Sequence, residues 1–82
     1  MVFVYVLKSL VDGRLYVGMS QDVINRLKEH NLGRTKSTKG YRPWIKIHEE
    51  VYPDRPTARH REKYLKSGYG KQWLKEKYKL VP

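Results

Sequence analysis

Apolar residues mark two short strands at the start of the chain. Residues 2–7 form a valine-rich apolar run, and residues 14–18 form a second short segment with strand character. Between them, Asp12 and Gly13 favour a two-residue hairpin turn, because both central positions of a type I′ turn need a positive φ. The first strand is apolar on both faces, which is typical of a central strand covered on both sides. The pattern predicts a β-hairpin whose first strand lies inside a sheet.

This hairpin is expected to bring two tyrosines together. With the Asp-Gly dipeptide at the centre of the turn, Ser9 faces Tyr16. The pairs nearer the turn are then Leu10 with Leu15 and Val11 with Arg14. Tyr5 lies on the same face as Ser9, because successive side chains of a strand alternate. We therefore expect Tyr5 and Tyr16 to emerge on one face of the hairpin.

A helix is predicted directly after the hairpin. Ser20 is a suitable N-cap for a helix over residues 21–31, and Gly33 is a natural stop just beyond its end. Asp22 then lies in the first turn, where a carboxylate complements the helix dipole. The buried stripe of this helix is expected to contain Val23, Ile24 and Leu27.

The second half of the chain predicts one more strand and two helices. Residues 32–43 have the composition of a loop, and residues 44–51 are expected to form a strand with Ile45, Ile47 and Val51 on one side. Pro56 can occupy the first turn of a second helix over residues 57–66, and a last helix follows over residues 70–79. The order β-β-α-β-α-α predicts an α+β fold, in which helices flank a small three-stranded, mainly antiparallel β-sheet.

The net charge of the chain indicates the class of partner that it binds. The 82 residues are few enough for a single domain over residues 1–82, and 18 Lys and Arg against 8 Asp and Glu give a net charge of +10. Such an excess favours a polyanion, for which nucleic acid and an anionic membrane surface are the usual choices, and neither long predicted helix has the strong apolar face that membrane binding needs. No apolar stretch is long enough to span a bilayer, and the N-terminus lacks the pattern of a signal peptide. We expect a cytoplasmic protein that binds nucleic acid and no membrane.

Two of the predicted helices carry candidate catalytic residues. Arg26 and His30 are four residues apart, as are Asp22 and Arg26, so the three share one helix face. The alternative is a solvated polar face with a single ion pair. In the second helix, Glu62 falls on the apolar stripe that should face the core. A buried carboxylate must be paired, protonated or bound to a metal, so Glu62 is either half of a structural salt bridge or part of a site.

Several kinds of site are excluded by what the chain lacks. No two carboxylates are clustered as in a two-metal nuclease, and the three histidines lie on different predicted elements, which disfavours zinc. There are no cysteines and no glycine-rich phosphate loop. A single Glu can still hold Mg²⁺, which keeps most of its waters and takes ligands from a substrate phosphate.

Positive charge gathers in two segments that would contact phosphates. The loop contributes Arg34, Lys36, Lys39 and Arg42, and the second helix contributes Arg59, Arg61, Lys63 and Lys66. Tyr41 and Trp44 offer stacking surfaces for bases, although a place in the core is the favoured interpretation for Trp44. Lys71, Lys75 and Lys77 are expected to be solvated.

Five elements in order resemble the GIY-YIG nuclease superfamily. They are the first motif Phe3-Val4-Tyr5, the second motif Tyr16-Val17-Gly18, and then Arg26, His30 and Glu62. The segment from Ala58 to Gly68 is similar to the second-helix signature of small single-domain bacterial members, and the whole resembles the UvrC N-terminal nuclease domain family. The resemblance covers almost the whole chain.

The resemblance implies a DNA endonuclease that depends on Mg²⁺ or Mn²⁺. Glu62 would hold the metal and Arg26 would stabilise charge on the phosphoryl oxygens. Tyr5 or Tyr16 would deprotonate or orient the attacking water with help from His30, and the resemblance does not say which tyrosine does so. The implied activity is structure-dependent or weakly sequence-specific cleavage in DNA repair or recombination.

Two positions depart from the family pattern. Met19 stands where some members have Lys, and no Asn that follows the metal-binding Glu in other branches is evident after Glu62. Two other functions therefore stay open. One is a non-catalytic nucleic-acid-binding module that retains the fold, and the other is a small basic protein associated with RNA or the ribosome.

Overall fold

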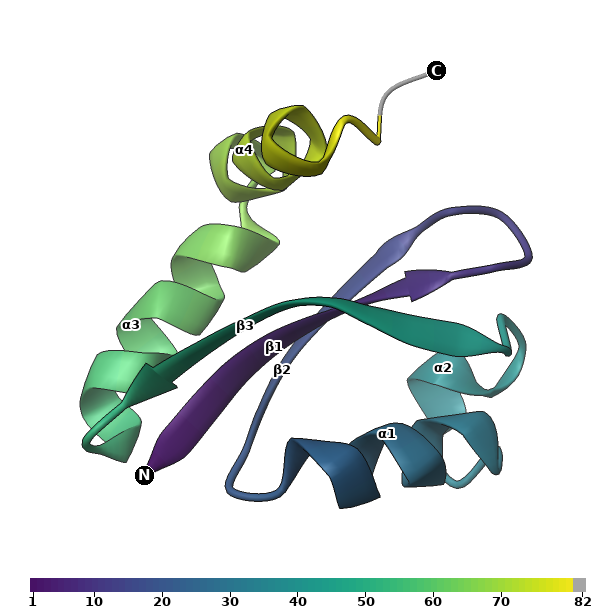
Figure 1. Ribbon diagram of the computed structural model, residues 1–82, viewed down its shortest axis with the longest axis horizontal. Coiled ribbons are helices and arrows are strands. Elements are labelled where there is room, and N and C mark those ends of the chain that lie inside the picture. The colour runs from purple at the N-terminus through teal and green to yellow at the C-terminus, as the bar shows by residue number, and fades with distance from the viewer. Residues whose placement is uncertain (81–82) are drawn as a thin grey trace.

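The computed structural model describes residues 1–80, so the last two residues of the expected domain lie outside it. Seven elements follow one another along the chain (Figure 1). They are β1 (Val2–Ser9), β2 (Leu15–Ser20), α1 (Val23–Asn31), α2 (Lys36–Lys39), β3 (Trp44–Tyr52), α3 (Arg55–Lys66) and α4 (Gly68–Tyr78). The predicted order is confirmed, with one addition: the single-turn helix α2 lies inside the segment expected to be a loop.

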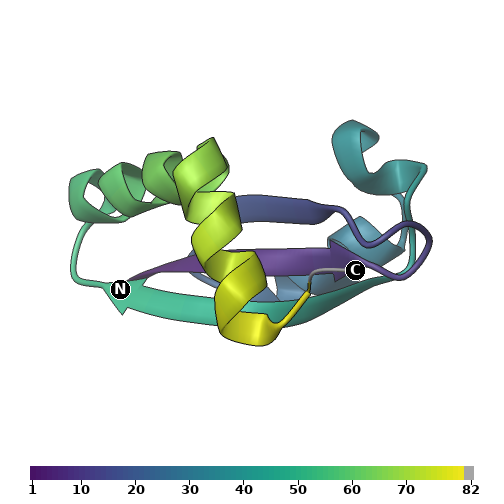
Figure 2. The ribbon, with the colours of Figure 1, turned by 90° about the horizontal axis from the view of Figure 1, so that it is seen from above.

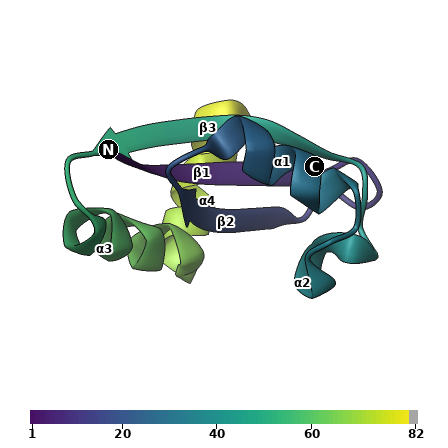
Figure 3. The ribbon, with the colours of Figure 1, turned by 90° about the horizontal axis from the view of Figure 1, so that it is seen from below.

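The three strands form one antiparallel sheet in the order β2-β1-β3. The valine-rich β1 is therefore the central strand, as its two apolar faces predicted. Figure 2 looks onto the face crossed by α4, and Figure 3 looks onto the face crossed by α1. In both views α3 and α2 lie beyond the β2 edge at opposite ends of that strand.

The hairpin register differs from the expected one by two residues. Tyr16 pairs with Leu7 rather than with Ser9, and the backbone bond from Ser9 N to Arg14 O closes a longer loop. Gly13 still has the positive φ of 77° that the turn requires. A shift of two residues preserves which face each side chain occupies, whereas a shift of one would reverse it. Tyr5 and Tyr16 therefore do share a face.

Two apolar cores lie on opposite sides of the sheet. Under α3 and α4, the valines of β1 pack with Ala58, Leu65 and Leu74. On the α1 side, Tyr5 and Leu7 pack with Val23 and Trp44. Trp44 is thus a core residue, as favoured from the sequence, and its Nε1 donates to the Thr38 carbonyl over 2.9 Å.

Three local expectations were wrong at α1. The N-cap is Asp22, whose carboxylate accepts a bond from Asn25 N over 3.0 Å, while Ser20 accepts from Asp22 N instead. Asp22 is therefore not in the first turn, and the helix begins two residues later than expected. Ile24 is 73% exposed, so only Val23 and Leu27 of the predicted stripe face the sheet.

A bulge alters the faces of β3. The register between β1 and β3 shifts between Val6 and Leu7, where Ile47 is the extra residue on β3. Ile45 is opposite Lys8 and Val51 is opposite Phe3, which point to different faces of the sheet. The expectation that Ile45, Ile47 and Val51 lie on one side was therefore wrong, and only Ile47 packs against a core.

The C-terminal helices agree more closely with the sequence. Pro56 lies in the first turn of α3, and Asp54 caps that helix by accepting from Thr57 N over 2.8 Å. Within the described part of the chain, no helix has the length and apolar character needed to cross a membrane.

Candidate active site

The two tyrosines of the hairpin meet beside a glycine. The Tyr5 and Tyr16 rings are 6.4 Å apart between centroids and tilted by 42°. A Cβ atom at Gly18 would lie 2.6 Å from the Tyr5 hydroxyl and 3.1 Å from the Tyr16 ring. Because real side chains avoid such contacts, Gly18 is required for the Tyr5 hydroxyl to lie against the β2 backbone.

His30 links Tyr5 to the single-turn helix α2. Its side chain is fully buried, its Nε2 lies 3.0 Å from the Tyr5 hydroxyl, and its Nδ1 lies 2.8 Å from Thr38 Oγ1. The Thr38 hydroxyl donates to the Thr35 carbonyl over 3.3 Å, so towards His30 it acts as an acceptor. This arrangement places the imidazole proton on Nδ1 and leaves Nε2 to accept from the Tyr5 hydroxyl.

Burial sets the proton affinities of this pair in opposite directions. Desolvation is the main reason that the pKa of Tyr5 is raised to about 12, although the nearby Arg26 guanidinium counteracts it. Desolvation, assisted by the charge of Arg26, lowers the pKa of His30 below its usual value. His30 is therefore a neutral proton acceptor at pH 7, and Tyr5 is a protonated donor.

Arg26 and Glu62 act on the same phenol from two different helices. Arg26 lies one turn before His30 on α1. Desolvation lowers the pKa of its guanidinium, but its interaction with the Tyr5 hydroxyl outweighs this effect and raises the pKa. Glu62 on α3 acts electrostatically on Tyr5 and raises its pKa. Arg26 also lies 3.5 Å from Glu29 on its own helix. The structure thus gathers Tyr16, Arg26, His30 and Glu62 around Tyr5.

Glu62 has the chemistry of a single metal ligand. Its side chain is 9% exposed, and its nearest cationic atoms are Arg59 Nε at 3.5 Å and Lys66 Nζ at 3.4 Å, which are longer than good hydrogen bonds. The carboxylate oxygens therefore keep lone pairs for a further ligand. Within residues 1–80 no three His, Cys, Asp or Glu side chains form a cluster. This donor set fits Mg²⁺, which needs one or two carboxylates and retains water.

Comparison with known proteins agrees with this geometry. The model of the GIY-YIG catalytic domain matches residues 1–79. The chain belongs to the GIY-YIG family. It is 39% identical over 66 residues to the UPF0213 protein of Staphylococcus aureus strain Mu3, covering 79% of both chains, and equally similar to that of strain Mu50. The solution NMR structure of the UPF0213 protein BH0048 from Bacillus halodurans superposes with a TM-score of 0.55 at 32% identity, covering 90% of this chain and 82% of that one.

Membership of the GIY-YIG family supports a nuclease-type activity and a nucleic-acid substrate. The structure shows where one departure from the family pattern, Met19, lies relative to the site. Met19 packs against the core under α3 and α4, on the opposite side of the sheet from the two tyrosines. A cation at this position would not lie beside Tyr5 on that face.

The basic residues fall into separate groups around the GIY-YIG site. The loop residues Arg34, Lys36, Lys39 and Arg42 are exposed on and around α2. Arg59 and Lys66 are exposed on either side of Glu62 on α3. Arg61, in contrast, is directed away from this group and donates two bonds to Glu50, at 2.8 and 3.1 Å. Tyr41 is stacked under Arg14, 3.5 Å from its guanidinium carbon, rather than free to receive a base.

The sequence did not reveal two features of the site and its surroundings. Thr38 lies in the segment expected to be a loop, where no sequence pattern indicated that it is buried. The second feature is a polar network between the sheet and α4. There His48 contacts Tyr78 and Glu50 at 2.5 and 2.6 Å, and Arg61 binds Glu50 from α3. Desolvation raises the pKa of Glu50, but the hydrogen bonds from Arg61, Tyr52 and His48 outweigh it and hold the pKa at about 2.

Proposed function

We propose that this protein is a divalent-metal-dependent DNA endonuclease that hydrolyses phosphodiester bonds with structure-dependent or weak sequence specificity, in DNA repair or recombination. The supporting observation is the Tyr5–His30 hydrogen bond, with Arg26 and Glu62 both acting on the same phenol. This observation supports a site in which Tyr5 and His30 exchange a proton, Arg26 supplies a positive charge and Glu62 would hold the metal.

The Tyr5–His30 pair provides the path for the proton of the attacking water. A free Tyr5 phenolate at pH 7 would cost about 7 kcal/mol, given the pKa of about 12 and 1.36 kcal/mol per unit. A relay avoids that cost: Tyr5 Oη accepts the water proton while its own proton passes to His30 Nε2. His30 can receive it because its imidazole is neutral at pH 7, which leaves the lone pair of Nε2 free to accept a proton.

The remaining groups act on the phosphate. Arg26 is partly exposed beside Tyr5, where its guanidinium can donate to the phosphoryl oxygens that gain charge in the transition state. Glu62 would hold Mg²⁺ or Mn²⁺, which supplies Lewis-acid polarisation of the scissile phosphate when bound. Tyr16 packs edge-on against the His30 ring, 4.8 Å between centroids, and restrains the orientation of the imidazole.

Phosphate contacts outside the reacting group come from the basic segments. We assign the loop residues Arg34, Lys36, Lys39 and Arg42 and the helix residues Arg59 and Lys66 to the backbone of the substrate. These side chains are exposed, and the two helices that carry or adjoin them, α2 and α3, lie at opposite ends of β2 (Figure 3). A DNA strand that follows the β2 edge would contact both groups.

The proposal is tested by incubating the protein with nicked, branched and plain duplex DNA in Mg²⁺ or Mn²⁺. We expect cleavage of at least one substrate, lost in EDTA and in Glu62→Gln. Glu76→Gln is the matched control, because Glu76 is an exposed carboxylate on α4, where it accepts a bond from Gln72. Cleavage of no substrate, or undiminished cleavage by Glu62→Gln, would refute the proposal.

One observation favours the alternative of a non-catalytic binding module. Glu62 lies near two cations of its own helix, Arg59 and Lys66, which is the arrangement expected of a purely structural ion pair. Salt-sensitive DNA binding without cleavage, unchanged by Glu62→Gln, would establish that alternative.

A further inference from the structure

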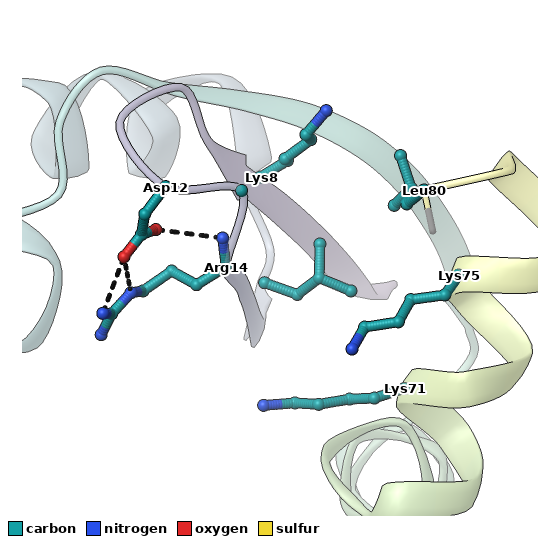
Figure 4. Close-up of a pocket in the computed structure, with 8 residues that line it drawn as sticks. Lys8, Asp12, Arg14, Lys71, Lys75 and Leu80 are labelled. Carbon is teal, nitrogen blue, oxygen red and sulfur yellow. Dashed lines mark hydrogen bonds and ion pairs between the residues drawn. The ribbon is translucent and has the colours of Figure 1, made fainter. Parts of the chain in front are cut away.

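A second basic site lies away from the catalytic group. A cleft of about 680 Å³ opens between the β1–β2 loop and α4 (Figure 4). Its walls carry Lys8, Arg14, Lys71 and Lys75, and its floor includes Leu15 and Leu80. The sequence predicted solvated lysines on α4. In the structure Lys75 is exposed and Lys71 is partly exposed, and both line this cleft together with Lys8 of β1.

Three ammonium groups in this cleft have no carboxylate partner among residues 1–80. The cleft's single acidic side chain, Asp12, is already bound to Arg14 over 2.7 Å. Lys71 and Lys75 are four residues apart on α4, so their side chains lie side by side and repel each other. Lys8 of β1 lines the same cleft, although Figure 4 shows its ammonium directed away from those of Lys71 and Lys75. An anion in the cleft would relieve this repulsion.

The cleft is joined to the basic loop around the end of the hairpin. Lys8 and Tyr5 are three positions apart on β1, so alternation places them on opposite faces of the sheet. Arg14 bridges the two faces, because it lines the cleft while its guanidinium stacks on Tyr41. Tyr41 directly precedes Arg42 of the basic loop. Positive charge is therefore continuous from the catalytic face to the cleft.

We propose that this cleft binds a single-stranded arm of a branched or tailed nucleic acid whose duplex arm lies on the catalytic face. This inference rests on the proposed function and specifies its substrate. The longest dimension of the protein is 33 Å, which corresponds to about ten phosphates along one strand. Over that length duplex DNA is stiff, since its persistence length is about 150 base pairs, so one unbent duplex does not reach both faces.

A single-stranded arm can both reach the cleft from the catalytic face and match its chemistry. It is flexible enough to turn around the hairpin end, and its phosphates match the three lysines. The apolar floor formed by Leu15 and Leu80 suits the faces of unpaired bases and their sugars. The cleft therefore selects a junction between duplex and single strand.

Binding in EDTA, where no cleavage occurs, separates this inference from catalysis. The probes are a blunt ten-base-pair DNA and the same duplex with an eight-nucleotide thymidine tail, each labelled for fluorescence anisotropy. The variants are Lys71→Gln/Lys75→Gln and Lys77→Gln/Lys79→Gln. Each variant loses two positive charges on α4 or at its C-cap. Lys77, in contrast to Lys71 and Lys75, is directed towards the Trp73 ring, 5.4 Å from its centroid, and does not line the cleft.

We expect the parent to bind the tailed DNA more tightly than the blunt duplex. The Lys71→Gln/Lys75→Gln variant should lose about 25-fold in affinity for the tailed DNA at 0.1 M salt, with a salt slope smaller by about 1.4, as for two lost contacts to a single strand. Its affinity for the blunt duplex should not change. The Lys77→Gln/Lys79→Gln control should retain the preference for the tail.

Three results would overturn the inference: a tail that adds no affinity in the parent, equal losses on both DNAs, or equal losses in both double variants. A protein that cuts no DNA in Mg²⁺ but shows the expected tail-dependent binding would refute the nuclease proposal and leave the cleft assignment intact.

Discussion

Thr38→Val removes one hydroxyl from a buried chain of hydrogen bonds. Thr38 has no exposed surface, and it accepts from His30 Nδ1 over 2.8 Å while donating to the Thr35 carbonyl. Valine keeps the shape, so no cavity forms, but the buried imidazole N–H loses its partner. Such an unsatisfied group costs about 1–3 kcal/mol. For a domain of this size, a loss of about 2 kcal/mol lowers Tm by about 8–16 °C.

The same change should alter the proton position on His30. Without Thr38 Oγ1 as acceptor, the His30 tautomer with its proton on Nδ1 loses the hydrogen bond that stabilises it. We therefore expect the tautomer with the proton on Nε2 to become populated. Its Nε2 would then donate to Tyr5 and could no longer accept the relayed proton, so cleavage should also slow. Thr35→Val is the matched control, since Thr35 begins the same short helix and its side chain makes no capping bond.

Two measurements decide the outcome. Urea unfolding gives the free energy difference between the two valine variants, and nitrogen chemical shifts of the imidazole report its tautomer. The reasoning is refuted if Thr38→Val unfolds within about 0.5 kcal/mol of Thr35→Val, the range of an ordinary surface substitution. It is also refuted if the His30 tautomer is unchanged.

Two further predictions concern packing and pH. Gly18→Ala should destabilise the protein by about 1–3 kcal/mol in urea unfolding and lengthen the Tyr5–His30 hydrogen bond, because the new Cβ would lie 2.6 Å from a buried hydroxyl. Gly40→Ala is the control, and it should be neutral in the same titration because the space around Gly40 is open. Glu50, with its pKa held at about 2 in the folded protein, should contribute stability that is fully present above about pH 4.5 and lost as the pH falls towards 2. The free energy of unfolding, measured between pH 2 and 6, should depend less on pH for Glu50→Gln than for the parent. A dependence as steep as the parent's would contradict this.

The sequence predicted those parts of the fold and site that depend on periodicity. The order of strands and longer helices followed from apolar spacing, and the same spacing placed Glu62 on the buried face of α3 beside Ala58 and Leu65. The shared face of Tyr5 and Tyr16 was predicted from a wrong register. It is nevertheless correct because an error of two residues preserves the alternation of side chains.

Features without periodicity could not be found this way. Helix α2 has four residues, too few for a repeating pattern, so the buried position of Thr38 gave no signal. The bulge at Ile47 reverses the alternation within β3, and it brings His48 and Glu50 to the α4 side. The choice between Ser20 and Asp22 as N-cap was ambiguous, because both side chains can accept a backbone bond and both do.

The central claim is that the Tyr5 hydroxyl carries the proton of the attacking water to His30. Single-turnover cleavage in Mg²⁺ by Tyr5→Phe tests it most directly, with Tyr69→Phe, an 85% exposed position, as the matched control. We expect the Tyr5→Phe rate to fall by about 10²–10⁴-fold, as for loss of a general acid–base group, with DNA affinity and the rate of the control unchanged. A Tyr5→Phe variant that cleaves at the rate of the parent would contradict the account.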